Sequence, residues 1–421
     1  MTRIRDILTT RGHAFVAAGL TLLVGGLLLG FTDITRVGVL LAALPLLSAL
    51  NARRGNSSVE VTRTVHPARL VVDQGARVVV VLQNTSDRHT QLLLAEESVH
   101  LLLGDRPRFV LPSMVPGDIR EVDYPIRSQV RGRFRLGPMT LRRQDPYGLA
   151  TITTTLPGSI EILVLPRVEV LGNGRPRAGG LGTEGAIPHM VALHGEDDVA
   201  VRTYRDGDDL RRIHWPATAH RSELMVRQED RPARRRAVIV LDSRTSGHQG
   251  SGSLGSFEWS VTAAASVAAH LFDHRYALHL VSSEAITEGT AAQTVEIDDA
   301  LACLALAQPG TLQQFDEVLH WAHPLTSAGG LVVAIATDHD ESVLRRIAAL
   351  RQPEGNGLLL LLDSATFGPA RAEAPAGRAS ALAGLVAGAG WSTCVVTSGM
   401  SVAAAWNAVS ARSPVTFGAG R

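Results

Sequence analysis

The pattern of hydrophobic and polar positions divides the chain into four parts. Residues 1–56 hold two long apolar runs separated by a few polar positions. Residues 57–166 consist of short stretches in which polar and apolar side chains alternate, the period of half-buried strands. Residues 167–236 are rich in glycine and charge and show little periodicity, and from 237 to 421 short apolar runs alternate with stretches of helical period. We therefore predict a multidomain protein with these boundaries.

The two apolar runs predict a transmembrane helical hairpin. Residues 14–31 form an uncharged run of 18 residues, and a helix of that length spans about 27 Å, close to the hydrocarbon thickness of a bilayer. The second run covers 14 residues from Val37 or 17 from Ile34, so a second span and a re-entrant segment both remain open. A cleaved signal peptide is disfavoured because no small-x-small site ends the first run.

The arginines around these runs predict the orientation of the hairpin. One arginine, Arg36, lies between the runs, whereas five flank them: Arg3, Arg5, Arg11, Arg53 and Arg54. The positive-inside rule then places both ends, and the domains that follow, on the cytoplasmic side of the plasma membrane.

The second part predicts a β-sandwich-like domain. Its expected strands are residues 59–63, 77–82, 92–103, 119–126 and 133–141. Short strands with Gly and Pro between them are typical of an antiparallel sandwich. Asp145-Pro146-Tyr147-Gly148 has the composition of a β-turn, to which we assign a structural role.

The fourth part predicts an α/β domain with a doubly wound parallel sheet, because strands and helices alternate along it. The expected strands are residues 237–242, 276–282, 331–337, 358–362 and 392–397. The expected helices are residues 257–274, 298–307, 312–323, 341–350, 381–389 and 402–411.

Charge is concentrated between these two domains. Residues 195–236 contain ten arginines and nine acids. We expect a short helix at 210–215 that Pro216 ends, followed by a strand at 223–227. Either the segment is an ion-pair network that fixes the two halves of the chain, or it is a recognition surface. Arg234-Arg235-Arg236 is interpreted as a solvated strand edge, with contact to anionic lipid as the alternative.

Composition narrows the function classes. The formal charge is +1, and acids nearly equal arginines in the charged segment, so we expect no nucleic-acid binding. The two cysteines, Cys303 and Cys394, exclude a disulfide framework and favour a reducing compartment.

Two acids, Asp242 and Asp338, end apolar strands, where doubly wound sheets bind ligands. Nearby hydroxyls would complete an all-oxygen shell for Mg²⁺ or Mn²⁺.

A long motif in the charged segment carries a family resemblance. Its positions are Arg202, Tyr204, Gly207, Asp208, Arg211, Ile213 and Trp215, followed by Ala219, Leu224, Val226 and Arg227. This motif resembles the signature of the bacterial domain-of-unknown-function family 58. The resemblance implies a membrane hairpin, a β-rich domain, the signature, and a von Willebrand factor type A-like domain.

The type A resemblance also implies a metal site, at Asp242, Ser246 and Asp338. The family pattern is Asp-x-Ser-x-Ser, and Arg244 replaces its middle serine. The alternative is that both acids are hydrogen-bonded strand-end carboxylates paired with Arg244.

The resemblance further implies a non-enzymatic, membrane-anchored scaffold or adaptor that binds protein partners. The implied partner is a MoxR-type AAA+ ATPase, in cell-envelope or stress-related assembly. The alternative function is a hydrolase that uses Asp208, His214 and Asp242 with Ser243 as nucleophile.

Overall fold

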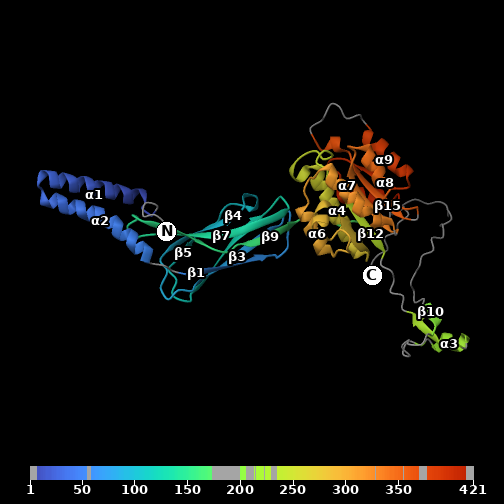
Figure 1. Cartoon of the computed structure of the whole chain (residues 1–421), viewed down its shortest axis with the longest axis horizontal. Coiled ribbons are helices and arrows are strands. Elements are labelled where there is room, and N and C mark those ends of the chain that lie inside the picture. The colour runs from blue at the N-terminus through green and yellow to red at the C-terminus, as the bar shows by residue number, and fades with distance from the viewer. Residues whose placement is uncertain are drawn as a thin grey trace, which may run out of the picture. The chain divides into compact units, whose positions relative to one another are not determined.

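The computed structural model shows two compact units, made mainly of residues 1–167 and of residues 168–421 (Figure 1). It describes residues 7–54, 58–172, 200–204, 213, 215–221, 223–228, 235–327, 329–353, 355–368 and 377–413. Two apolar helices and a sheet-rich region form the first unit, and an α/β fold with a parallel sheet forms most of the second.

The chain begins with two antiparallel helices, α1 (Thr10–Leu29) and α2 (Thr32–Arg54). The Thr9 side chain caps α1 by accepting a hydrogen bond from the Gly12 N–H. Both helices are long and apolar enough to cross a membrane, and only 17% and 22% of their most apolar windows are buried. Such exposure is atypical of core helices in soluble proteins. The second helix is a regular element of 23 residues that continues through Pro45, so the apolar run underestimated its length.

Glycines let the two helices approach closely. Gly12, Gly19 and Gly26 are the buried positions of α1. Gly19 and Gly26 lie against α2, whereas Gly12 lies against the Leu149 carbonyl. A Cβ at Gly19 would lie 2.6 Å from the Ala42 nitrogen, and one at Gly38 would lie 2.5 Å from the Leu23 nitrogen. This packing of small residues is typical of helix pairs in membranes.

The hairpin is joined to the sheet region by main-chain hydrogen bonds. The Thr9 N–H donates to the Leu149 carbonyl at 3.0 Å, and the Thr151 N–H donates to the Ile7 carbonyl at 2.7 Å. The Thr9 hydroxyl also donates to the Gly148 carbonyl. The loop after the predicted Asp145–Gly148 turn is therefore the point where the hairpin attaches.

Two sheets build the rest of the first unit. The smaller has the order β1-β3-β6, with β1 Val59–His66, β3 Gly75–Asn84 and β6 Ile119–Arg127. The larger has the order β2-β9-β7-β4-β5, and β8 also pairs with β7. Its strands are β2 Leu70–Val71, β4 Leu93–Val99, β5 Arg108–Leu111, β7 Gly132–Gln144, β8 Thr151–Leu156 and β9 Ile160–Leu165. All pairings are antiparallel except that of β2 with β9.

The two sheets share one hydrophobic core. A buried ion pair crosses it: Arg63 of β1 donates to both carboxylate oxygens of Glu97 in β4, at 2.7 and 3.2 Å. A Cβ at Gly137 would lie 3.1 Å from Arg63 Nη2, so the glycine leaves room for the guanidinium. Burial, and next the charge of Glu97, raise the pKa of Tyr124 well above its ordinary value. A fully paired charge of this kind favours one register of the sheets over alternatives.

The α/β fold is built on a five-stranded sheet in which all strands are parallel. Its order is β13-β12-β14-β15-β16, with β12 Arg236–Leu241, β13 Ala277–Val281, β14 Leu331–Thr337, β15 Asn356–Leu362 and β16 Ser392–Val396. Counted from β12, this is the order 2-1-3-4-5, one of the two common doubly wound orders. Its switch point lies between β12 and β14.

Helices cover both faces of this sheet (Figure 1). On one face α4 (Ser256–Asp273) packs beside α10 (Val402–Ser410), and on the other lie α7 (Leu312–Ser327), α8 (Glu341–Ala348) and α9 (Arg378–Gly388). The shorter α5 (Ser283–Thr287) and α6 (Ile297–Leu306) lie between β13 and α7 in the chain. The predicted parallel sheet is confirmed.

Several elements differ from the sequence prediction. The strand expected at 92–103 ends at Val99 and is followed by a 3₁₀ turn at Leu101–Leu103. In the charged segment, Pro216 lies in the first turn of helix α3 (Trp215–Arg221) rather than ending a helix. The physical reason is that proline lacks an N–H, and the first turn needs none.

Candidate functional site at the carboxyl edge of the parallel sheet

The switch point brings together the two acids that the strand ends predicted. Asp242 follows β12 and continues its ladder, since its N–H donates to the Ile335 carbonyl of β14 at 2.9 Å. Thr337, the last residue of β14, approaches Asp242 Oδ2 with its N–H at 3.4 Å and its hydroxyl at 3.3 Å. Asp338 follows directly. The Asp242 carboxylate is fully buried, so its charge requires compensation.

Arg244 supplies that compensation. Its Nε lies 2.9 Å from Asp242 Oδ1 and its Nη2 lies 2.8 Å from Oδ2, a bidentate pair. The Arg244 side chain is only 2% exposed and stacks over the Phe315 ring, 5.4 Å from its centroid. Burial alone would lower the pKa of Arg244, but its bonds to Asp242, with the charges of Asp340 and Asp316, raise it above its ordinary value.

The remaining predicted metal ligands lie in other environments. The Asp338 carboxylate accepts from the N–H of Ser364 at 3.1 Å and from its hydroxyl at 2.7 Å. Ser246 is exposed. In the described part of the chain, no three His, Cys, Asp or Glu side chains are grouped so that they could hold a metal ion. As arranged, Asp242, Ser246 and Asp338 do not fit Mg²⁺ or Mn²⁺, because a guanidinium takes both Asp242 oxygens.

This geometry favours the alternative that the sequence left open. Asp242 is a strand-end carboxylate paired with Arg244. The alternative paired both acids with Arg244. Arg244 binds Asp242, whereas Asp338 accepts hydrogen bonds from Ser364.

His248 and Asp340 are neighbours that the sequence did not indicate. His248 lies between the Asp242 carbonyl, 2.8 Å from its Nε2, and the Ser256 hydroxyl, 3.0 Å from its Nδ1. Burial lowers the pKa of His248. Asp340 caps α8 by accepting a hydrogen bond from the Ser342 N–H, and its carboxylate lies 3.8 Å from Arg244 Nη1. The hydrogen bonds with Ser342, together with the charge of Arg244, lower the pKa of Asp340. Both residues position the loops around the ion pair.

Ser243 does not have the surroundings of a nucleophile. It is 1% exposed, and its hydroxyl forms no hydrogen bond with any described residue. A serine nucleophile needs a base within hydrogen-bond reach. The other members of the hydrolase hypothesis, Asp208 and His214, lie outside the described residues.

The signature segment is described in part. Arg202 lies in β10 (Ala200–Thr203), which pairs antiparallel with β11 (Met225–Gln228). The N–H of Tyr204 donates to the Leu224 carbonyl at 2.8 Å. Ile213 is half-buried, and Trp215 is 66% exposed at the start of α3. Gly207, Asp208 and Arg211 lie outside the described residues, so the choice between ion-pair network and recognition surface stays a prediction.

The comparisons with known proteins concern this segment above all. A family model described as "Protein of unknown function DUF58" matches residues 200–294. No curated protein matches.

Solved structures match with low scores. The alkylpurine DNA glycosylase AlkC of Pseudomonas fluorescens is 18% identical over 31% of this chain and 38% of its own, with a TM-score of 0.19. A CARDB domain from Pyrococcus furiosus is 13% identical over 26% of this chain and 89% of its own, with a TM-score of 0.20. A β-glucosidase from Listeria innocua is 13% identical over 26% of this chain and 16% of its own, with a TM-score of 0.16. The chain thus spans well under two thirds of the glycosylase and the glucosidase, and scores this low carry no argument.

The family match covers every position of the predicted signature, from Arg202 to Arg227. Residues 200–294 of this chain match the model of domain-of-unknown-function family 58, as the signature predicted.

Proposed function

We propose that this chain is a membrane-anchored, non-enzymatic scaffold that binds a protein partner at the carboxyl edge of its parallel sheet. The partner we propose is the MoxR-type AAA+ ATPase that the family resemblance implies, in cell-envelope or stress-related assembly at the cytoplasmic face. The buried Asp242–Arg244 pair is the observation that supports this proposal most directly.

The pair converts a place for small ligands into a surface. Doubly wound sheets bind ligands in the crevice outside the carboxyl ends of the strands, at the switch point. Here the Arg244 side chain fills that place and lies on Phe315. A neutralised and filled crevice offers a protein partner a continuous contact area and requires no buried charge on the partner.

The rim of this edge has the composition of a contact surface. The segment after Arg244 runs beside Gly310, to which the Thr245 N–H donates at 2.8 Å. Two residues further, Leu312 is 50% exposed at the start of α7, and Leu254 is 82% exposed in the loop between β12 and α4. Large apolar side chains among exposed hydroxyls are typical of protein interfaces.

The type A-like part of the proposal rests on the same edge. A parallel sheet whose first strand ends in an acid supports the comparison with a von Willebrand type A-like domain. The difference is that a guanidinium stands where that pattern has a hydroxyl. We therefore propose docking that needs no divalent cation on this chain.

Co-purification tests the proposal. The full chain is captured from detergent-solubilised membranes, in Mg²⁺ and in EDTA, and bound ATPase is identified by mass spectrometry. Leu312→Arg introduces a charge at the edge, and Trp321→Arg makes the same change nine residues along α7 at a side chain that is 41% exposed. We expect capture by the wild type and by Trp321→Arg, and at least a tenfold loss with Leu312→Arg.

Each outcome bears on a separate part of the proposal. Absence of an ATPase from the wild-type capture contradicts the partner. Equal capture by Leu312→Arg contradicts the edge. If capture requires Mg²⁺ and Asp338→Asn also abolishes it, the divalent-cation prediction is restored.

A further inference from the structure

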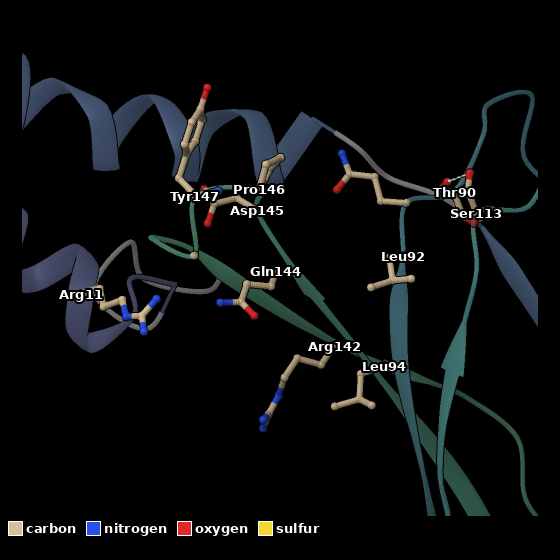
Figure 2. A pocket seen from close by; sticks show the side chains of 12 residues that line it. Arg11, Thr90, Leu92, Leu94, Ser113, Arg142, Gln144, Asp145, Pro146 and Tyr147 are labelled. Atoms are coloured by element: carbon tan, nitrogen blue, oxygen red, sulfur yellow. Dashed lines mark hydrogen bonds between the residues drawn. The ribbon is translucent and has the colours of Figure 1, made fainter.

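A pocket lies where the hairpin meets the sheet region, away from the site described above. Its cavity volume is about 740 Å³. One wall is the first turn of α1, which contributes Arg11, and another is the end of β7 with Arg142 and Gln144. Leu92, which precedes β4, and Leu94 in β4 form a third side (Figure 2).

The pocket carries net positive charge. Neither Arg11 nor Arg142 forms an ion pair or hydrogen bond with a described residue, and both are exposed. Asp145 is the one acid among the lining residues. Its carboxylate already accepts the N–H of Ala150 at 2.6 Å and that of Tyr147 at 3.1 Å. Two guanidiniums against one carboxylate leave the lining with a net charge of +1, and that carboxylate bonds to backbone N–H groups.

The backbone directs these side chains into one space. Arg142 is in register with Leu94 of β4, and Gln144, two residues on, lies on the same face of the sheet. A Cβ at Gly148 would lie 3.1 Å from Gln144 Nε2 and 3.9 Å from Arg11 Nη1. Figure 2 shows Arg11 and Gln144 pointing toward each other, with Arg142 beside Leu94.

The apolar part of the pocket is equally defined. Among the lining residues, Leu92 is 64% exposed and Tyr147 is 68% exposed. Arg11 lies in the first turn of a 20-residue apolar helix, and such a helix, about 30 Å long, crosses the hydrocarbon core with its first turn at the headgroup level. The guanidiniums of Arg11 and Arg142 and the apolar side chains of the pocket therefore lie at the depth of lipid phosphates.

We propose that this pocket binds the phosphodiester headgroup of an anionic phospholipid. Arg11 and Arg142 donate to the phosphate oxygens, a geometry to which planar guanidiniums are suited. Gln144 donates through its amide, and Leu92 and Leu94 contact the glycerol region. The proposal rests on the membrane anchoring of the proposed function and is independent of the protein partner.

Native mass spectrometry of the purified full chain in detergent tests this site. The probes are phosphatidylglycerol, phosphatidylcholine and inorganic phosphate. We expect saturable binding of phosphatidylglycerol, weaker binding of phosphatidylcholine, and about a fivefold loss of affinity in Arg142→Gln, since one basic residue near an anionic headgroup contributes about a factor of five. Leu94→Trp keeps the charge but fills the pocket, and we expect it to weaken binding as well.

The matched control is Arg127→Gln. Arg127 is exposed at the end of β6, where it pairs with the start of β3, at the end of the small sheet opposite to Val59 and the hairpin. Unchanged binding in this variant supports the pocket. Equal loss in Arg142→Gln and Arg127→Gln shows diffuse electrostatic attraction, and unchanged binding in both Arg142→Gln and Leu94→Trp shows that the lipid binds elsewhere; either result overturns the proposal.

Two further results would overturn the lipid assignment. Inorganic phosphate that competes at equimolar concentration shows a site for soluble phosphate. Extraction of the chain from membranes by alkaline carbonate shows that the anchoring fails, whereas a failed ATPase capture leaves these lipid measurements unaffected.

Discussion

Arg244 shows how one residue changes the chemistry of a strand end. Asp242 occupies the switch point and is fully buried, a position that elsewhere suits a cation or a substrate. The guanidinium two residues later folds back onto both of its oxygens. The loop after β12 thus supplies the counter-ion of Asp242, and the ion pair stabilises the carboxyl edge of the parallel sheet.

Removal of this counter-ion has a predictable cost. We expect Arg244→Met to lower the free energy of unfolding by about 3–5 kcal/mol, because it leaves a buried carboxylate without its charge partner. The double variant Asp242→Asn with Arg244→Met removes both charges and should recover much of that loss. Denaturant unfolding of the full chain in detergent measures both effects.

The control is Arg345→Met, which breaks an exposed pair with Glu341 and should change stability little. If Arg244→Met were equally mild, the ion pair would not be what stabilises this edge.

His270 gives the second unit a sensitivity to acid. It is 6% exposed on α4 and packs edge-on against Trp406 of α10. Burial, and next the neighbouring His274, lower its pKa to about 4. Unfolding therefore takes up a proton once the pH falls below about 6.5, the ordinary value. We expect the free energy of unfolding to decrease between pH 6.5 and 4 by at most about 3 kcal/mol from this residue.

Histidine NMR checks the cause directly. The His270 ring resonance, assigned by its loss in His270→Gln, should not titrate between pH 8 and 5. A midpoint near 6.5 for that resonance would contradict the buried, neutral state.

At the scale of elements, the hairpin depends on its glycines. We expect Gly19→Val to separate the helices, because even a Cβ there would meet the Ala42 nitrogen at 2.6 Å and the Gly38 carbonyl at 2.9 Å. Overpacking of this kind costs about 1–3 kcal/mol. Gly25→Val is the same exchange on the same helix where nothing lies within 4 Å, so it should be neutral. Thermal unfolding in detergent distinguishes them, and equal Tm values would argue against the close packing.

The elements that the sequence predicted are those with a strong period. β14 is buried at every position and matches its predicted bounds, Leu331–Thr337. β8, with the sequence TITTTL, has three exposed threonines in a row and no apolar alternation. β2 and β5 have only two and four residues, too short for a period to be recognised. Such strands form because neighbouring strands offer free hydrogen-bonding groups. Which strands are neighbours depends on the tertiary fold, so the local sequence does not predict them.

The candidate site was predictable to the same extent. Strand ends placed Asp242 and Asp338 at one edge because parallel strands end together. The position of Arg244 against Phe315, 71 residues later in the chain, depends on how α7 packs. The sequence therefore indicated where the charges meet, and the packing decided which of them pair.

At the scale of the molecule, the proposed membrane anchoring and the attachment of the hairpin together predict on which side of the membrane the sheet region lies. The strand-like contacts of Ile7 and Thr9 with residues 149–151 hold that region at the end of the hairpin where α1 begins. The positive-inside rule predicts that this end is cytoplasmic and that the opposite end, where Asp33 lies in the first turn of α2, is not. Both native cysteines are buried, so a single introduced cysteine reports on one position.

We expect Asp33→Cys to react with a membrane-impermeant maleimide in intact spheroplasts. Asp105→Cys, in an exposed loop of the sheet region, should react only after the membrane is permeabilised. The wild type should remain unlabelled in both conditions, because Cys303 and Cys394 are buried. The reverse pattern would place the sheet region outside the cell, and an ATPase in the cytoplasm would then have no access to a chain attached in this way.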